Sequence, residues 1–308
     1  MERDTRPAAC DADLFVHCGP DTSLDFGGGS PVSYWSDVFR RFTRQRSAVV
    51  FGAMLVLIIL GCFLIPPVIG KPIAGVMEDA INAPPSARHW LGADRLGHDI
   101  FTKVWKGGQV SFTVGFTAAI LQAVIGTLIG GMAAYNGGWV ETATMRVVDV
   151  LISIPYLIIV LCIRMIAGPG EGTIIFALVV TGWMNIARLT RGQVLQLMKE
   201  DYVTAARFMG VRPASIMLRH LIPNTLGVLI VSFTLGVPQA MFSEAFLSFI
   251  GMGSNAVSWG SLIRSGMETR FTRPLQLVVA SGLLALTMLC IQLVGDSLRD
   301  ALDPKLRK

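Results

Sequence analysis

Four stretches without a charged residue constrain this chain more than any other feature. They cover residues 47–70, 107–140, 221–243 and 274–295. Each is longer than the roughly 18 apolar residues that mark a membrane-spanning helix. Only 15% of the residues are charged and 52% are hydrophobic, whereas an ordinary globular domain has about 25% charged residues. Buried helices of a soluble protein are a poor alternative, so the sequence predicts an all-α, polytopic membrane protein.

Two shorter apolar runs, at residues 150–163 and 172–187, raise the predicted number of transmembrane helices to six. The predicted organisation is a disordered lead (1–33), an interfacial basic segment (34–46), a first transmembrane helix (47–69) stopped by Pro66-Pro67, an external loop (70–106), a five-helix core (107–296) and a cytoplasmic tail (297–308). Within the core, span three is expected inside residues 145–167. No signal peptide is expected, because about 46 residues precede the first apolar run.

The basic residues predict the orientation of the chain. Arginines at positions 40, 41, 44 and 46 directly precede the first span and should stay in the cytoplasm. If both termini are cytoplasmic, the cytoplasmic segments hold 17 Lys and Arg and the external loops hold 8. These residues lie beside the apolar runs rather than on one face or tail, so the net charge of +5 indicates membrane topology and not nucleic-acid binding.

Two charged residues fall inside span three, Asp149 near its cytoplasmic start and Arg164 near its external end. A charged residue within a span is a functional hypothesis by default. Both lie within reach of an interface, and the favoured interpretation is that each side chain extends to the headgroup region. A part in transport chemistry is the alternative.

The sequence lacks the common signatures of enzymes. It has no GxxxxGK[ST] phosphate loop, no HExxH and no GxSxG. The five cysteines form no CxxC pair. His89 and His98 make a weak metal signal in the external loop, and two solvated histidines are the favoured interpretation. We therefore expect no catalytic residue, metal or cofactor on this chain.

A polar, basic insert at residues 200–224, EDYVTAARFMGVRPASIMLRHLIPN, separates two apolar runs. A helix is expected through residues 204–206, a sharp turn at Gly210, a second helix starting at Pro213, and an end at Pro223. The small residues 205 and 206 allow close backbone approach. A short helical piece of this kind can enter a groove on a partner, so the insert is predicted to be a docking element.

The insert resembles the loop that defines the permease subunits of bacterial ABC importers, with the pattern E-A-A, three residues, G, nine residues, I-x-L-P. Thr204 stands where that family usually has Glu, and His220 where the pattern has Ile. The resemblance implies that loop 200–223 couples the chain to an ATPase. The residues expected to do so are Thr204, Ala205, Ala206, Gly210, Pro213, Ile216, His220 and Pro223.

Three further stretches are similar to the C-type permease of the dipeptide, oligopeptide and nickel group. They are HWLGADRLGHDIFTKVWKGG (89–108), MRVVDVLISIP (145–155) and SEAFLSFIGMGSNAVSWG (243–260), and the resemblance covers about residues 35–305. The motif positions to which it assigns structural roles are Asp94, Gly97, Asp99, Asp149, Pro155, Glu244, Gly251, Trp259 and Gly260.

The resemblance implies a permease subunit of an ATP-driven importer in the bacterial cytoplasmic (inner) membrane. Its implied partners are a second, B-type permease subunit, two cytoplasmic ABC ATPase subunits, an extracytoplasmic solute-binding protein and membrane lipid, with no nucleic acid. The partner ATPases would bind ATP and Mg²⁺, and this chain would bind no cofactor. Peptides are the expected substrate, and nickel or another chelated small solute is the alternative.

Three alternatives from other classes are weaker. A secondary transporter should show internal repeats and interrupted helices, and an integral membrane enzyme should show a cluster of acids, His or Ser near an interface; neither is evident. A scaffolding protein would not need the coupling-type insert.

Two further questions stay open at this point. Glycines 115, 126, 130 and 131 in span two allow close helix contacts either between subunits or within one subunit. Trp90, Trp105 and Trp259 fit either an interfacial belt or partner recognition.

Overall fold

The structure is a computed structural model that describes residues 34–70, 80–272 and 274–302. The predicted lead (1–33) lies outside the described residues, as do 71–79 of the predicted external loop and 303–308 of the predicted tail. The chain divides into two compact units, Met1–Asp37 and Val38–Lys308. Only the beginning of α1 is described in the first unit, and the second unit contains all the other helices.

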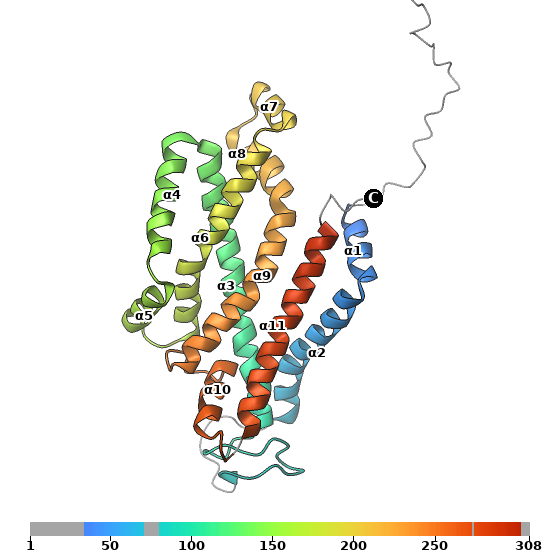
Figure 1. Cartoon of the computed structure of the whole chain (residues 1–308), viewed down its shortest axis with the longest axis vertical. Coiled ribbons are helices and arrows are strands. Elements are labelled where there is room, and N and C mark those ends of the chain that lie inside the picture. Colours follow the sequence, from blue (N-terminus) through green and yellow to red (C-terminus); the bar gives the residue numbers. More distant parts are fainter. Residues whose placement is uncertain (1–33, 71–79, 273, 303–308) are drawn as a thin grey trace, which may run out of the picture. The chain divides into compact units, whose positions relative to one another are not determined.

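The described residues form helices, and the one β pairing among them is an isolated bridge between Ala93 and Asp99. The helices are α1 (Tyr34–Arg44), α2 (Arg46–Ile69), α3 (Ile100–Asn136), α4 (Gly138–Ser153), α5 (Tyr156–Ala167), α6 (Glu171–Leu197), α7 (Asp201–Phe208), α8 (Pro213–Ile216), the π-helical turn η3 (Met217–Leu221), α9 (Ile222–Phe249), α10 (Trp259–Glu268) and α11 (Pro274–Leu302). Figure 1 shows their arrangement. This confirms the predicted all-α class.

Among the described residues, five helical segments are long and apolar enough to cross a membrane: α2, α3, α6, the run from α8 through α9, and α11. A sixth span results if α4 and α5 are counted together, although they are bent by 85° relative to each other. Span three, expected as one helix within residues 145–167, is therefore two helices. Ile154 is extended (φ −80°, ψ 128°) and Pro155 precedes α5. The break occurs here because a proline disfavours the helical conformation of the residue before it.

Helix α2 passes through Pro66 and Pro67 and ends at Gly70, whose φ is +63°. The expectation that the two prolines stop the helix is wrong. A proline at 66 removes the N–H that would bond the carbonyl of Cys62, and the side chain of Gln109 on α3 donates to that carbonyl instead, at 2.8 Å. The contact satisfies the carbonyl that the proline leaves without a helical partner, and it joins α2 to α3.

Helix α3 begins at Ile100, so the last seven residues of the predicted external loop are helical. It packs most extensively against α6 and then against α9. A Cβ on Gly126 or Gly130 would meet the backbone of α6 at Trp183 or Ala187, and one on Gly115 would meet Met241 of α9. The glycines thus serve close packing within this chain, which decides between the two interpretations left open by the sequence.

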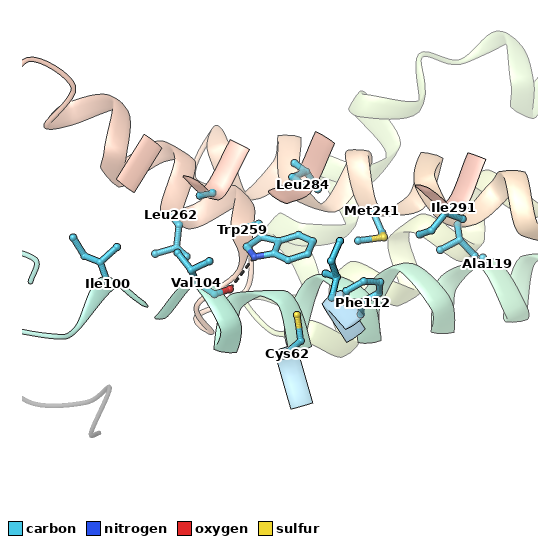
Figure 2. Close-up of a cluster of buried hydrophobic side chains, with 14 residues drawn as sticks. Cys62, Ile100, Val104, Phe112, Ala119, Met241, Trp259, Leu262, Leu284 and Ile291 are labelled. Carbon is cyan, nitrogen blue, oxygen red and sulfur yellow. Dashed lines mark hydrogen bonds between the residues drawn. The ribbon is translucent and has the colours of Figure 1, made fainter. Parts of the chain in front are cut away.

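The largest apolar core joins α2, α3, α9, α10 and α11 around Trp259, whose side chain is fully buried. Figure 2 shows its indole against Phe112 and Met241, with Nε1 donating to the carbonyl of Val104 at 2.8 Å. Trp259 belongs neither to an interfacial belt nor to an exposed recognition surface. Its place at the first residue of α10 fixes that short helix against the long ones.

Helix α11 continues to Leu302, so the first residues of the predicted cytoplasmic tail are helical. Its last turn packs Ala301 and Leu302 against Val38 of α1, with Val231 of α9 at the margin of the same cluster. This small cluster ties the start of the second unit to its end.

Candidate functional site

The insert at residues 200–223 folds as a helical hairpin. Helix α7 ends after Phe208, and the chain turns at Gly210, whose φ is +73°. Left-handed backbone of this kind carries little strain in glycine alone. The N–H of Val211 returns to the carbonyl of Ala206 at 3.2 Å and closes the turn. The structure therefore has the sharp turn at Gly210 that the sequence predicts.

The second arm of the hairpin is continuous with a spanning helix. Pro213 occupies the first turn of α8, where its missing N–H costs little. The chain then passes through the π-turn η3 into α9, and residues 213–249 count as one membrane-crossing helix. Pro223 lies in the first turn of α9 and does not end the segment, contrary to the expectation. The wider π-turn accommodates the proline without breaking the helix.

One face of the hairpin is anchored in its own apolar cluster. Val203 and Ala206 of α7 pack with Ile216, Met217 and Leu221 of the second arm. The same cluster includes Ala134 near the end of α3 and Val194 near the end of α6. The hairpin is thus fixed to the ends of two long helices rather than attached by flexible linkers.

The opposite face of the hairpin is exposed. Of the eight predicted coupling residues, Ala206 and Ile216 are buried, His220 is half-buried, and five are exposed, namely Thr204, Ala205, Gly210, Pro213 and Pro223. Phe208 and Met209, at the end of the first arm, are 88% and 74% exposed. Neither residue is among the predicted coupling residues, although both are large apolar residues that lie between Arg207 and Arg212.

A second polar site lies where α9, α10 and α3 meet. Glu244 is fully buried, and its two carboxylate oxygens accept from Ser111 at 2.9 Å and Ser248 at 2.7 Å. Ser258 donates to Ser248 at 3.2 Å, and the backbone N–H of Trp259 donates to Ser111 at 3.3 Å. A buried carboxyl group is tolerated only when such partners satisfy it. Glu244 therefore joins the two ends of the motif stretch 243–260 to Ser111 of α3.

The two motif glycines beside this site permit close contacts. A Cβ on Gly260 would collide with the carbonyl oxygen of Ala245, so α10 and α9 could not approach as they do. Gly251 has φ +89°, and a Cβ there would meet the guanidinium of Arg264. Both positions require glycine for packing or backbone conformation.

The loop before α3 holds the third group of motif residues. Asp99 precedes α3 and caps it, accepting from the backbone N–H of Thr102 at 3.0 Å. Asp94 accepts from the backbone N–H groups of Leu96 and His98, each at 2.9 Å, and from Lys103 at 2.5 Å. Gly97 completes the turn with φ +81°. These contacts fold the loop against the first turn of α3.

The histidines of this loop are not solvated, contrary to the favoured interpretation. His98 is 3% exposed and its Nδ1 lies 3.4 Å from Asp94. His89 contacts Asp99 through Nδ1 at 2.9 Å. Within the described ranges, no group of three or more His, Cys, Asp or Glu side chains could hold a metal ion. Aspartate pairing explains both histidines.

The ionised form of Asp94 should stabilise this loop. Partial burial acts to raise the pKa of Asp94, but the hydrogen bonds from Lys103 and from the N–H groups of His98 and Leu96 outweigh it and lower the pKa. The stabilisation is therefore present above the ordinary aspartate pKa of about 4 and is lost as the pH falls through the lower pKa of the folded state. We expect Asp94→Asn to raise hydrogen exchange at the amides of Leu96 and His98.

Mass-spectrometric exchange at about pH 7 and at a series of pH values below about 4, corrected for intrinsic rates, would measure this effect. The wild-type amides should lose protection at the lower pH values, whereas the Asn variant should change less. Glu268→Gln is the matched control, because Glu268 makes an exposed ion pair with Arg95 near the same loop. Equal protection in the Asn variant and the wild type would contradict the prediction.

The two charged residues of span three differ in their exposure to solvent and in their partners. Asp149 of α4 pairs with Arg188 of α6, and both side chains are about half exposed. Arg164 of α5 is only 6% exposed, so the expectation that it extends to the interface is wrong. Its guanidinium donates to the carbonyls of Gly168 at 2.7 Å, Met252 at 2.9 Å and Gly253 at 2.5 Å. Arg164 thus joins the loop after α5 to the loop after α9.

Comparison with known proteins now identifies the family. The family described as "Binding-protein-dependent transport system inner membrane component" matches residues 126–308. This chain belongs to that family. The family described as "N-terminal TM domain of oligopeptide transport permease C" matches residues 33–85, which include α1 and α2. The chain is therefore a multi-pass protein of the bacterial inner membrane.

Relatives in the family match the chain over nearly its whole length. It is 41% identical to the dipeptide transport system permease protein DppC of Bacillus subtilis, over 90% of this chain and 88% of the relative. It is 39% identical to the oligopeptide transport system permease protein OppC of the same organism, over 90% of this chain and 92% of the relative. Both relatives are named as permease proteins of transport systems.

A solved structure confirms the fold. A chain of the MetNI methionine ABC transporter, in an inward-facing conformation, aligns with a TM-score of 0.55 at 21% sequence identity. The alignment covers 65% of this chain and 96% of that chain. The fold of this family member is that of an ABC importer permease.

Proposed function

We propose that this chain is one permease subunit of an ATP-driven importer for peptides, and that the hairpin at residues 200–223 couples it to a cytoplasmic ATPase. The names of its relatives support the substrate, because both Bacillus subtilis proteins are named for peptides. No relative cited above is named for nickel, so peptides remain the first candidate. A second permease subunit, two ATPase subunits and a solute-binding protein complete the proposed assembly.

The observation that carries the coupling proposal is the exposed apolar end of the hairpin. Phe208 and Met209 extend from a rigid element whose other face is buried. Large exposed apolar side chains beside basic ones are typical of a protein interface, where aromatic residues often dominate the binding energy. Arg207 stacks on Tyr135 at 5.2 Å, which fixes the base of this surface to the end of α3.

The connection of the hairpin to α9 supports a mechanical role. Because α8, η3 and α9 form one helix, a displacement of the hairpin by the ATPase would act directly on α9. Helix α9 packs along α3, α6 and α11, and near its other end it holds Glu244 and the start of α10. Alternation between two packings of these helices would open the path to one side of the membrane and then to the other.

The arrangement of the helices fits the proposed orientation. Figure 1 shows α7 at the top and the C-terminal end of α11 in the upper half, and α10 with the loop before α3 at the lower end. We propose that the upper end faces the cytoplasm, as the distribution of Lys and Arg predicts. The lower end would then meet the solute-binding protein.

The substitution Phe208→Asp tests the coupling proposal. A charge at the centre of an apolar contact should weaken binding of the ATPase about tenfold, because a buried interfacial aromatic commonly contributes more than 1 kcal/mol. Binding of the purified ATPase to the permease pair in detergent would measure the effect, and ATP-dependent peptide uptake into proteoliposomes should fall in parallel.

Phe271→Asp is the matched control, since Phe271 is equally exposed at 88% but lies between α10 and α11. It should leave the affinity for the ATPase unchanged. Equal weakening by both substitutions, or unchanged affinity in Phe208→Asp, would show that the hairpin is not the docking element.

A further inference from the structure

A charged pocket of about 630 Å³ lies between α4 and α6. Its wall includes Glu141, Arg146 and Asp149 of α4 and Arg188 and Arg191 of α6. Small-molecule sites commonly measure about 300–1,000 Å³, so the pocket has the size of a ligand site. Its charged lining distinguishes it from the largely apolar pockets that bind most organic ligands.

Two ion pairs cross the pocket. Asp149 pairs with Arg188, and Glu141 accepts from Nε of Arg191 at 2.6 Å. In both pairs the acidic residue is on α4 and the arginine is on α6, and the two pairs lie at different positions along the helices. Arg146 lies between the two acids in sequence, is exposed, and has no ionic or hydrogen-bonded partner for its side chain among residues 34–70, 80–272 and 274–302. The pocket therefore holds two matched pairs and one additional cation.

The charged side chains of this pocket are partly exposed, and its arginines lie toward the ends of α4 and α6 that the distribution of Lys and Arg places at the cytoplasm. Helix α6 is a candidate span, and α4 is the first part of the bent pair that forms another. Charged side chains within spans face the interior of a bundle or a water-filled cavity. On α4, the apolar residues Val147 and Val150 are 56% and 63% exposed, so this helix has a separate surface suited to lipid or a partner helix. These partly exposed charges are in contact with water, and the pocket fits the cytoplasmic end of the proposed path.

We propose that this pocket is a transient binding site for the two charged ends of a zwitterionic peptide on the translocation path. The peptide carboxylate would bind Arg146 and then compete for Arg188 or Arg191. The peptide ammonium would bind the carboxylate that this exchange releases, Asp149 or Glu141. This inference rests on the proposed import of peptides and assigns the part of the chain that receives them.

Exchange of ion-pair partners explains why such a site suits transport. A peptide that enters replaces one ion pair by two, so neither charge of the opened pair is left without a partner. The reverse exchange releases the peptide without leaving an unpaired charge either. A site that binds the charged ends makes no demand on the peptide side chains, as an importer of varied peptides requires.

Photocrosslinking to the complete transporter complex tests the inference. The probe is the tripeptide alanyl-benzoylphenylalanyl-alanine, added to the purified complex in detergent without nucleotide. Benzophenones insert readily into methionine C–H bonds, and Met145 is the apolar residue that lines the pocket. We expect the label at or beside Met145, and a roughly tenfold lower yield in Arg146→Gln, the loss expected for a charged hydrogen bond.

Four comparisons make the test specific. The C-amidated form of the same tripeptide should label poorly in the wild type and should be insensitive to Arg146→Gln. Arg146→Lys should retain part of the labelling, and Arg40→Gln, at an exposed arginine of α1 outside the pocket, should retain all of it. Added phosphatidylglycerol should not compete; competition would assign the site to a lipid phosphate and overturn the proposal.

Parallel uptake measurements separate this inference from the proposed function. Proteoliposomes containing the complex could import the free tripeptide while the pocket stays unlabelled, or while the labelling does not depend on Arg146 and the peptide carboxylate. In either case the pocket is not a peptide site, and the proposed import of peptides is unaffected. If the complex imports another solute but no peptide, the proposed function fails, and the inference fails with it.

Discussion

Replacing Trp259 with alanine is expected to lower the free energy of unfolding by about 3–5 kcal/mol, the usual range for truncating a buried tryptophan. The indole is fully buried and packs edge-on against Phe112, with 5.6 Å between the ring centroids. Its Nε1 donates to the carbonyl of Val104 at 2.8 Å. The substitution would leave a cavity at the centre of the largest core and an unpaired carbonyl on α3.

Thermal unfolding of the purified protein in detergent would measure this loss. For a chain of this size, each kcal/mol lowers the Tm by roughly 2–4 °C, so a decrease of about 10 °C is expected. Trp139→Ala is the matched control, because Trp139 on α4 is 82% exposed. Trp259→Phe should be intermediate, since it keeps most of the volume and loses the hydrogen bond. Similar shifts for Trp259→Ala and Trp139→Ala would contradict the packing described here.

Leucine at position 130 is expected to prevent the close packing of α3 on α6. A Cβ at Gly130 would overlap the carbonyl oxygen of Ala187, which is backbone and cannot rotate away. Overpacking commonly costs about 1–3 kcal/mol, and a clash with backbone belongs at or above the top of that range. The yield of folded Gly130→Leu protein should fall sharply, and any folded protein should have a Tm lower by roughly 6–12 °C.

The control for this substitution is Gly192→Leu on α6. Gly192 is also a helical glycine, but a Cβ there would meet no atom within 4 Å. Leucine has the higher helix propensity of the two residues, so this variant should be as stable as the wild type or slightly more stable. The yield of monodisperse protein in size-exclusion chromatography would compare the two variants. Normal folding of Gly130→Leu would mean that α3 and α6 lie farther apart.

Much of the fold follows from local features of the sequence. Charge-free runs longer than about 18 residues predict spanning helices because an apolar environment requires every backbone group to be paired within the helix. The hairpin is equally local: a glycine turn and a proline at a first helical position require no distant contact to be recognised. The helical class and the turn at Gly210 could therefore be predicted without the structure.

Two errors in the predicted fold share one physical cause. Both involve a backbone or side-chain group whose partner lies far away in the sequence. Pro66 does not stop α2, because Gln109 satisfies the carbonyl that the proline leaves free. Arg164 does not reach the interface, because the carbonyls of Met252 and Gly253 surround its guanidinium. Composition and periodicity contain no information about such distant partners.

The candidate sites also contain features that the sequence reveals and features that only the folded chain reveals. The sequence pattern marks Glu244 and Trp259, but only the folded chain shows that both are joined to Ser111 on α3. The pocket between α4 and α6 was not predicted, because Arg188 and Arg191 were interpreted only as cytoplasmic charges. Their acidic partners on α4 are about 40–50 residues distant in the chain. The coupling role of the hairpin remains a prediction.

The π-turn at Met217–Leu221 has a consequence for how evolution or engineering can alter this chain. A π-turn contains one residue more than the α-helix it interrupts, and each residue of an α-helix turns the chain by about 100°. The direction in which α8 presents its exposed face is thus set, relative to α9, by the presence of a single residue. Deleting that residue would leave the span intact and reorient the hairpin, so the same permease helices could be refitted to a differently placed partner by a change in length alone.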